Sequence, residues 1–272
     1  MPDRLRRAAR LAAVFPALCV AACASSPVTR TGALTSYDGM TSVKTIRTRA
    51  RIVADGPALA AARSVRIAQV AYGPGVDAKV SRADSALVAN LVGRVLCLKL
   101  SDKFDIAPAG GPADLTVRVV ITRMTPTNRE AAGVSVPLRA ASMAFGVPFA
   151  GRVPIGMGAF AAEGEAVDAS GAQRAGMTWA RGADMFTNRA RVSKIGDAYE
   201  LSAAFSGDLA ALIVTGKNPL HDAPPLALGK RGRPVPAACD VYGKSNGAES
   251  FLSGFIGAPP GWTDSKSPPA PK

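Results

Sequence analysis

Apolar and polar residues alternate most clearly at residues 115–122, where we expect a strand. The apolar positions are Leu115, Val117, Val119 and Ile121, with polar residues at Thr116, Arg118 and Thr122. Successive side chains of a strand point to opposite faces, so one face of this strand is buried and the other is wet. Shorter strand patterns lie at 65–72 and 104–107, and a hairpin is expected from 160–168 and 174–181.

Two other segments repeat apolar residues at helical spacing. Residues 82–100 follow the cap pattern of Ser81 and Asp84, and a second helix begins at Asp197 with the same pattern and ends at Gly216. The apolar faces consist of Leu87, Leu91, Val95 and Leu98 in the first helix and Leu201, Phe205, Leu209 and Leu212 in the second. We therefore predict an α+β fold, a two-layer domain with both amphipathic helices on one face of a mixed, mostly antiparallel sheet.

The patterning divides the chain into four parts. We expect a signal peptide at 1–22, a flexible tether at 23–36, the α+β domain at 37–216 and a tail at 217–272 that is rich in proline and glycine. Residues 37–64 show no clear period. The tail has few large apolar residues, and those that could dock on the domain are Phe251, Leu252, Phe255, Ile256 and Trp262.

The N-terminus combines four arginines with a short apolar run at 11–20, which is typical of a signal peptide and too short to span a bilayer. The next stretch, Val20-Ala21-Ala22-Cys23, resembles the lipobox of bacterial lipoproteins. The resemblance implies a diacylglycerol thioether on Cys23, cleavage after Ala22 and acylation of the freed amine. The alternative is an ordinary signal peptide with an incidental cysteine. Position 24 is not aspartate, which by the same resemblance favours the outer membrane, on its periplasmic side.

Charge and composition narrow the choice of partners. The 272 residues are 48% hydrophobic and carry a formal net charge of +13, of which the signal segment holds +3. We expect this charge to be spread over the surface for solubility. The alternative is an anionic envelope polymer or lipid as partner, rather than nucleic acid, which an exported protein rarely meets.

Four cysteines are present, and two remain as free thiols after export. Cys19 leaves with the signal peptide and Cys23 is acylated, so Cys97 and Cys239 are expected to form a disulfide in an oxidising compartment. Closing this loop of about 140 residues stabilises the fold by about 4–5 kcal/mol in the chain-entropy model. The alternative is a buried thiol at Cys97 and an unpaired Cys239. Because no Cys/His cluster occurs, we expect neither a metal site nor a cofactor.

Candidate catalytic residues are few. Glu163 and Glu165 stand two apart on a strand and share a face, so they could act as a glycosidase pair, although a solvated strand face is the favoured reading. His221, the only histidine, lies in the tail and is a weak candidate for a general base. The serines considered as nucleophiles, none of them in a nucleophile elbow, are Ser85, Ser142 and Ser193. We therefore assign no catalytic residue.

Residues 140–162 form an apolar stretch with one charge, Arg152. Prolines at 148 and 154 and several glycines argue against a transmembrane helix. We expect a glycine-rich strand pair buried in the domain. The alternative is an exposed apolar loop that contacts a membrane or a partner.

Several short motifs carry a family resemblance. They are Gly32-Ala33-Leu34, Tyr37-Asp38, the run GPADLTVRVVITRMTP at 111–126, and Glu163 with Asp168-Ala-Ser-Gly171. Together they resemble a family of bacterial outer-membrane lipoproteins known only as a domain of unknown function, over roughly residues 32–216. The resemblance implies a small α/β envelope lipoprotein and brings no catalytic residues.

We therefore expect a lipid-anchored periplasmic binding or scaffold lipoprotein of the outer membrane, without enzymatic activity. Its partners would be the membrane, through the lipid on Cys23, and an envelope protein or anionic envelope component. One rival function is an enzyme that acts on peptidoglycan or another glycan through Glu163 and Glu165. Another is an accessory role in lipid transport that uses the 140–162 stretch.

Overall fold

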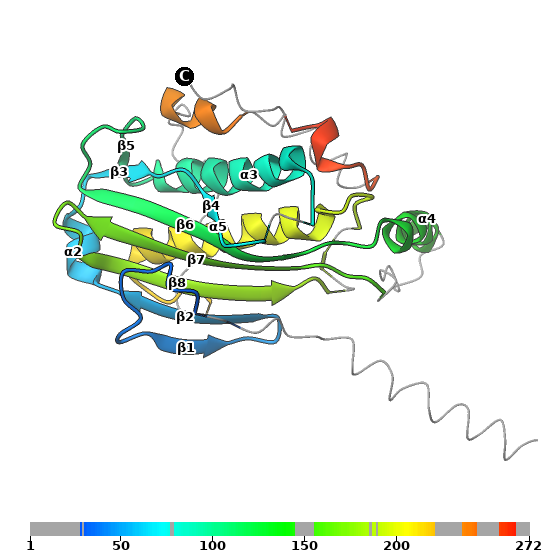
Figure 1. The fold of residues 1–272 in the computed structure, drawn as a ribbon, viewed down its shortest axis with the longest axis horizontal. Helices are drawn as coiled ribbons and strands as arrows, with labels where there is room; N and C mark the ends of the chain where they lie inside the picture. Colours follow the sequence, from blue (N-terminus) through cyan, green and yellow to red (C-terminus); the bar gives the residue numbers. More distant parts are fainter. Residues whose placement is uncertain are drawn as a thin grey trace, which may run out of the picture.

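The computed structural model describes residues 28, 30–76, 79–144, 155–184, 187–188, 190–220, 236–243 and 256–264, with side chains to residue 137 in the helix that ends at 144. In these residues one mixed sheet has the order β1-β2-β8-β7-β6-β3-β5, with β4 beside β6 (Figure 1). The strands are β1 (Thr41–Lys44), β2 (Thr48–Ala54), β3 (Ser64–Ile67), β4 (Ala71–Tyr72), β5 (Asp105–Ile106), β6 (Leu115–Thr125), β7 (Ala159–Asp168) and β8 (Gln173–Gly182). The helices are α2 (Gly56–Ala61), α3 (Arg82–Leu100), α4 (Arg129–Ala144) and α5 (Gly196–Thr215), with 3-10 turns η2 (Ala237–Tyr242) and η3 (Pro260–Trp262).

The sheet is mostly antiparallel, as predicted. The β7–β8 hairpin lies at its centre, and β6 and β2 flank the hairpin in antiparallel register. The strands β3 and β4 pair with β6 in parallel, and β5 pairs with β3 in parallel at the edge. The α+β class is therefore confirmed, with α3 and α5 packed together over the sheet (Figure 1).

The core lies between the β7–β8 hairpin and α5. Phe160 and Trp179, on neighbouring strands, contact Phe205 of α5, with ring centroids 5.9–6.2 Å apart in all three pairs. Gly164 lies directly beneath α5, because a Cβ there would come within 2.5 Å of Leu209 Cδ2. The residues of β7 that share the face of Phe160 and Gly164 therefore belong to the core, and the intervening residues point to the opposite face.

The first predicted helix is confirmed as α3, residues Arg82–Leu100. Ser81 Oγ accepts a hydrogen bond from the Asp84 amide at 3.1 Å, as the cap pattern predicts. The second helix, α5, ends as predicted at Gly216, whose φ of +66° is left-handed.

The cap predicted at the start of α5 is wrong. The helix is preceded by Ile195, which makes no side-chain cap bond. Asp197 is fully buried, and its Oδ2 accepts hydrogen bonds from Thr127 Oγ1 at 2.9 Å and from the Gly158 amide at 2.6 Å. Its carboxylate ties the helix to the connections before α4 and β7, contacts that lie far away in the sequence.

Residues 37–64 contain more structure than their pattern indicates. They form β1, β2 and the six-residue α2. In β2 the buried positions are Thr48, Ala50 and Ile52, and the polar Thr48 and the small Ala50 weaken the hydrophobic signal. The strand predicted at 65–72 is split into β3 and β4, which both pair with β6.

The strand pair expected in residues 140–162 is not what the structure shows. Residues 140–144 end the helix α4, and 159–162 begin β7, while 145–154 lie outside the described residues. The Asn128 side chain accepts a hydrogen bond from the Ala131 amide at 2.9 Å at the start of α4. Among the helices that the structure describes, none is long and apolar enough to cross a membrane.

Candidate functional site

The face of the sheet opposite α5, which we call the outer face, is basic. The basic residues that alternate onto it are Lys44 on β1, Arg49 and Arg51 on β2, Arg66 on β3, and Arg118 and Arg123 on β6. Two acidic residues of β7, Glu163 and Glu165, lie on the same face between these strands. Both carboxylates are nevertheless buried, each with 1% exposure, because residues 30–37 cross over them. We call residues 30–37 the N-terminal strap.

Glu163 holds the first half of the N-terminal strap. Its Oε1 accepts a hydrogen bond from the Thr31 amide at 2.9 Å. Its Oε2 accepts bonds from Thr31 Oγ1 at 3.0 Å, the Ala33 amide at 3.2 Å and the Tyr37 hydroxyl at 2.5 Å. Burial, and next the bond to Glu163, raise the pKa of Tyr37, so its hydroxyl remains a donor. The guanidinium of Arg30 lies 5.5 Å from the centre of the Tyr37 ring.

Glu165 holds the second half of the N-terminal strap. Its oxygens accept bonds from the Thr35 amide at 2.9 Å, from Thr35 Oγ1 at 3.2 Å and from Gln173 Nε2 at 2.9 Å. Arg118 lies 2.7 Å from Glu165 Oε1 and also donates to Thr35 Oγ1 at 2.8 Å. A buried carboxylate is stable only when it is paired and hydrogen-bonded, and the strap supplies most of these partners.

Two sequence-based expectations are therefore wrong here. Residues 23–36 were expected to be a flexible tether, but residues 30–36 belong to the N-terminal strap and Leu34 is buried. Glu163 and Glu165 do share a face, yet they are not solvated. The physical reason is that the strap satisfies the carboxylates with backbone amides that no local pattern of β7 reveals.

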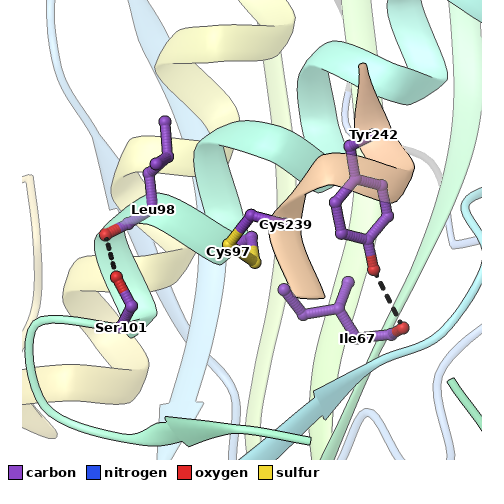
Figure 2. Close-up of a disulfide and its surroundings, with 6 residues drawn as sticks. All are labelled: Ile67, Cys97, Leu98, Ser101, Cys239 and Tyr242. Atoms are coloured by element: carbon purple, nitrogen blue, oxygen red, sulfur yellow. Dashed lines mark hydrogen bonds between the residues drawn. A yellow bond between two sulfur atoms is a disulfide. The ribbon is translucent and has the colours of Figure 1, made fainter. Parts of the chain in front are cut away.

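A second strap lies on the other side of the molecule, over α3. It consists of residues 236–243 and 256–264, which we call the C-terminal strap. Cys97 of α3 and Cys239 of η2 form the predicted disulfide, with Cα atoms 5.7 Å apart (Figure 2). Both residues are buried, so the bond is shielded from water.

The ring of Tyr242 lies on α3 next to the disulfide. Its hydroxyl donates to the Ile67 carbonyl at 3.2 Å, which joins the strap to β3 (Figure 2). Burial raises the pKa of Tyr242 to about 12. The close approach depends on Gly93, where a Cβ would come within 2.3 Å of the Tyr242 ring.

A buried ion pair fixes the end of the C-terminal strap. Arg94 of α3 donates two hydrogen bonds of 2.7 Å to Asp264, one to each carboxylate oxygen. The Tyr199 hydroxyl of α5 donates to Asp264 Oδ2 at 2.5 Å, and burial followed by the charge of Asp264 raises the pKa of Tyr199. Arg94 is 6% exposed and Asp264 is 5% exposed. A bidentate pair this deeply buried stabilises the docked strap only while both partners are present.

The C-terminal strap docks differently from the sequence expectation. Trp262 and Ile256 were candidates for docking, but they are 77% and 65% exposed. The other three candidates, Phe251, Leu252 and Phe255, lie outside the described residues, as do His221 and Cys23. Arg94 and its buried partner Asp264 are 170 residues apart, and no spacing rule relates the two.

The described residues offer little chemistry beyond these contacts. Among them, no group of three or more His, Cys, Asp or Glu residues is placed to hold a metal ion. Charged side chains of the domain instead bind the two straps, which precede and follow the domain in the sequence. Of the basic side chains on the outer face, Lys44, Arg118 and Arg123 are exposed, whereas Arg49, Arg51 and Arg66 are half-buried.

A comparison with curated proteins found no match. Among solved structures, the chain is similar to the PelC dodecamer from Paraburkholderia phytofirmans and to a variant of it, each with 16% identity, a TM-score of 0.34, and coverage of 64% of this chain and 96% of that chain. The family DUF3313, described as a protein of unknown function, matches residues 29–209, which include the N-terminal strap and end within α5. The chain therefore belongs to the DUF3313 family.

Proposed function

We propose that this protein is a lipid-anchored periplasmic lipoprotein of the outer membrane, which acts by binding or scaffolding and not by catalysis. The observation that carries the proposal is the N-terminal strap, in which Glu163 and Glu165 hold the first described residues on the domain. A chain that is anchored through Cys23 would thereby gain a fixed connection between lipid and domain, with only a few residues between them.

The burial of the same carboxylates supports binding over glycan hydrolysis. A glycosidase needs one carboxyl group to protonate the leaving oxygen and a second to act as base or nucleophile, and both must reach the sugar. Glu163 and Glu165 are each 1% exposed, and all four of their oxygens accept hydrogen bonds from the chain itself.

The anchor is tested with two matched cysteine variants. Cells that make the wild-type chain should incorporate an alkyne fatty acid into it, and the Cys23→Ser variant should lose this label and leave the membrane fraction. Cys19→Ser is the control, because Cys19 precedes the proposed cleavage site and its loss should leave labelling unchanged. Full labelling of the Cys23→Ser variant would contradict the proposal.

Catalysis is tested separately on purified protein. We expect no release of soluble fragments from peptidoglycan sacculi by the wild-type chain. The opposing result is release that is lost in Glu163→Gln and retained in Tyr37→Phe, which removes the strap contacts of this hydroxyl but keeps both carboxylates. Crosslinking in cells would then identify the bound partner.

A further inference from the structure

The strand register brings several connections to one end of the sheet. The β1–β2 turn at 45–47 lies there, since Lys44 pairs with Arg49. The last residues of β6 and β8 and the first of β7 lie there too, because Ala159 pairs with both Thr125 and Gly182. Figure 1 shows that β1 points toward the end at which α4 lies. We call this the α4 end.

Exposed apolar side chains gather at the α4 end. Six large apolar residues of the described chain are exposed, and four of them belong here: Ile46 (100%), Val134 (61%), Ile155 (63%) and Ile256 (65%). Ile256 is placed by its neighbour Gly257, whose carbonyl accepts a bond from the Val192 amide just before α5. Single exposed apolar residues are ordinary, but a group of them at one end of a domain indicates a contact surface.

The same end is basic. Its exposed basic residues, among those described, are Lys44, Arg47, Arg123, Arg129 and Lys194, and its exposed acidic residue is Glu130. Asp184 is half-buried, and its Oδ2 atom lies 3.5 Å from Arg47 Nε and 3.3 Å from Arg181 Nη2. Ile46 thus projects from a turn with basic residues on either side, an arrangement that suits the boundary between lipid headgroups and acyl chains.

The N-terminal strap points toward this end. Thr35 is bound at Glu165 and Thr31 at Glu163, so the strap followed back toward the N-terminus runs toward the start of β7. Arg30 follows Cys23 by seven positions, and even when fully extended this stretch spans only about 25 Å. A lipid on Cys23 therefore keeps the α4 end within reach of the bilayer, and this step rests on the proposed lipid anchor.

We infer that the α4 end is a second, direct membrane contact that binds the anionic phospholipid surface of the anchoring leaflet. Ile46 enters the interface, while Lys44 and Arg47 lie at the phosphate level. The contact orients the domain, so that the β7–β8 turn at 169–172, at the other end of the hairpin, points away from the membrane.

The test uses the intact acylated protein reconstituted into vesicles. A polarity-sensitive dye is attached to Ile46→Cys or, as a matched control at the opposite end, to the exposed Ala169→Cys. With phosphatidylglycerol in the vesicles, we expect a blue shift at position 46 and about threefold weaker quenching by an aqueous quencher than at position 169. Adding Lys44→Glu and Arg47→Glu to the Ile46→Cys chain should abolish both effects.

Several outcomes would overturn this inference. Equal quenching at the two positions on anionic vesicles is one, and protection of position 46 before vesicles are added is another, because the surface would then be covered by a second copy. Flotation with vesicles of phosphatidylcholine alone reports the acyl anchor. A chain that floats but leaves position 46 exposed refutes the contact and retains the anchor, whereas a chain that does not float refutes the anchor itself.

Discussion

The Tyr37 hydroxyl donates a hydrogen bond of 2.5 Å to Glu163 Oε2, across 126 residues of sequence. The bond joins the N-terminal strap to the central strand of the sheet. The Tyr37 hydroxyl and the Thr31 and Ala33 amides all bind the carboxylate of Glu163. Loss of one of these hydrogen bonds exposes the charged carboxylate to water and thereby weakens the other bonds.

We first predict that Glu163→Gln destabilises the strap. The amide replaces one acceptor oxygen by a donor that faces the donors of Thr31, Ala33 and Tyr37, so we expect a loss of about 2–3 kcal/mol in the free energy of unfolding. Tyr37→Phe removes the bond to Glu163 and the two bonds that the hydroxyl accepts from the Gly32 and Leu34 amides, and should cost about 1–2 kcal/mol. Denaturant unfolding and amide hydrogen exchange at Thr31 and Ala33 measure the effect. Unchanged exchange in Glu163→Gln would mean that other contacts hold the strap.

The buried ion pair gives a second prediction. Asp264→Ala should cost about 3–5 kcal/mol, because it leaves Arg94 charged and buried without its partner. The double variant Arg94→Met, Asp264→Leu should recover most of that loss, since packing then replaces the pair. Thermal unfolding of the wild type and the single and double variants tests this. Equal losses of stability in the single and double variants would show that the unpaired charge of Arg94 does not cause the destabilisation.

The disulfide between Cys97 and Cys239 gives a third prediction. Replacing Cys97 and Cys239 with alanine should lower the free energy of unfolding by about 5 kcal/mol in the chain-entropy model. Limited proteolysis should then cut within the C-terminal strap while the sheet remains intact. Mass spectrometry of non-reduced, alkylated protein provides the check on the native chain, where two alkylated cysteines would exclude the bond.

Asp208 makes stability depend on pH. Burial raises its pKa to about 6, against the opposing effects of the Trp179 Nε1 bond at 2.8 Å and the charges of Arg181 and Lys99. The folded state therefore binds more protons than the unfolded state between about pH 4 and 6, so this contribution to stability is present at low pH and is lost as pH rises through that window.

The Asp208→Asn variant should consequently be more stable than the wild type at pH 7, by on the order of 2 kcal/mol. The asparagine oxygen can still accept the Trp179 bond. The difference should disappear well below pH 4, where the wild-type carboxyl is protonated in both states. Unfolding curves at several pH values test this, and a difference independent of pH would refute the raised pKa.

Sequence patterns predicted the elements whose signals are local. The α3 helix was delimited by the cap of Ser81 and by apolar spacing, and the β7–β8 hairpin by two strand patterns around a turn. The disulfide followed by elimination, because two cysteines remained after Cys19 and Cys23 were assigned.

The rest depends on contacts that have no local pattern. Asp197 resembles a helix cap, but its carboxylate is used by Thr127 and Gly158 instead. Glu163 resembles a solvated residue until the strap, 126 to 132 positions earlier, is placed over it. Long-range pairing of this kind is set by the assembled sheet, and a single sequence carries no periodic trace of it.

The spacing between strap and carboxylates also sets an order of events in time. In a chain exported from its N-terminus, Thr31 emerges 132 residues before Glu163, and Cys97 emerges 142 residues before Cys239. In such a chain the N-terminal strap would stay accessible to modifying enzymes during most of translocation, and it would dock only when the β7–β8 hairpin has formed. Anchoring would precede folding, and oxidation of the last cysteine would close the molecule.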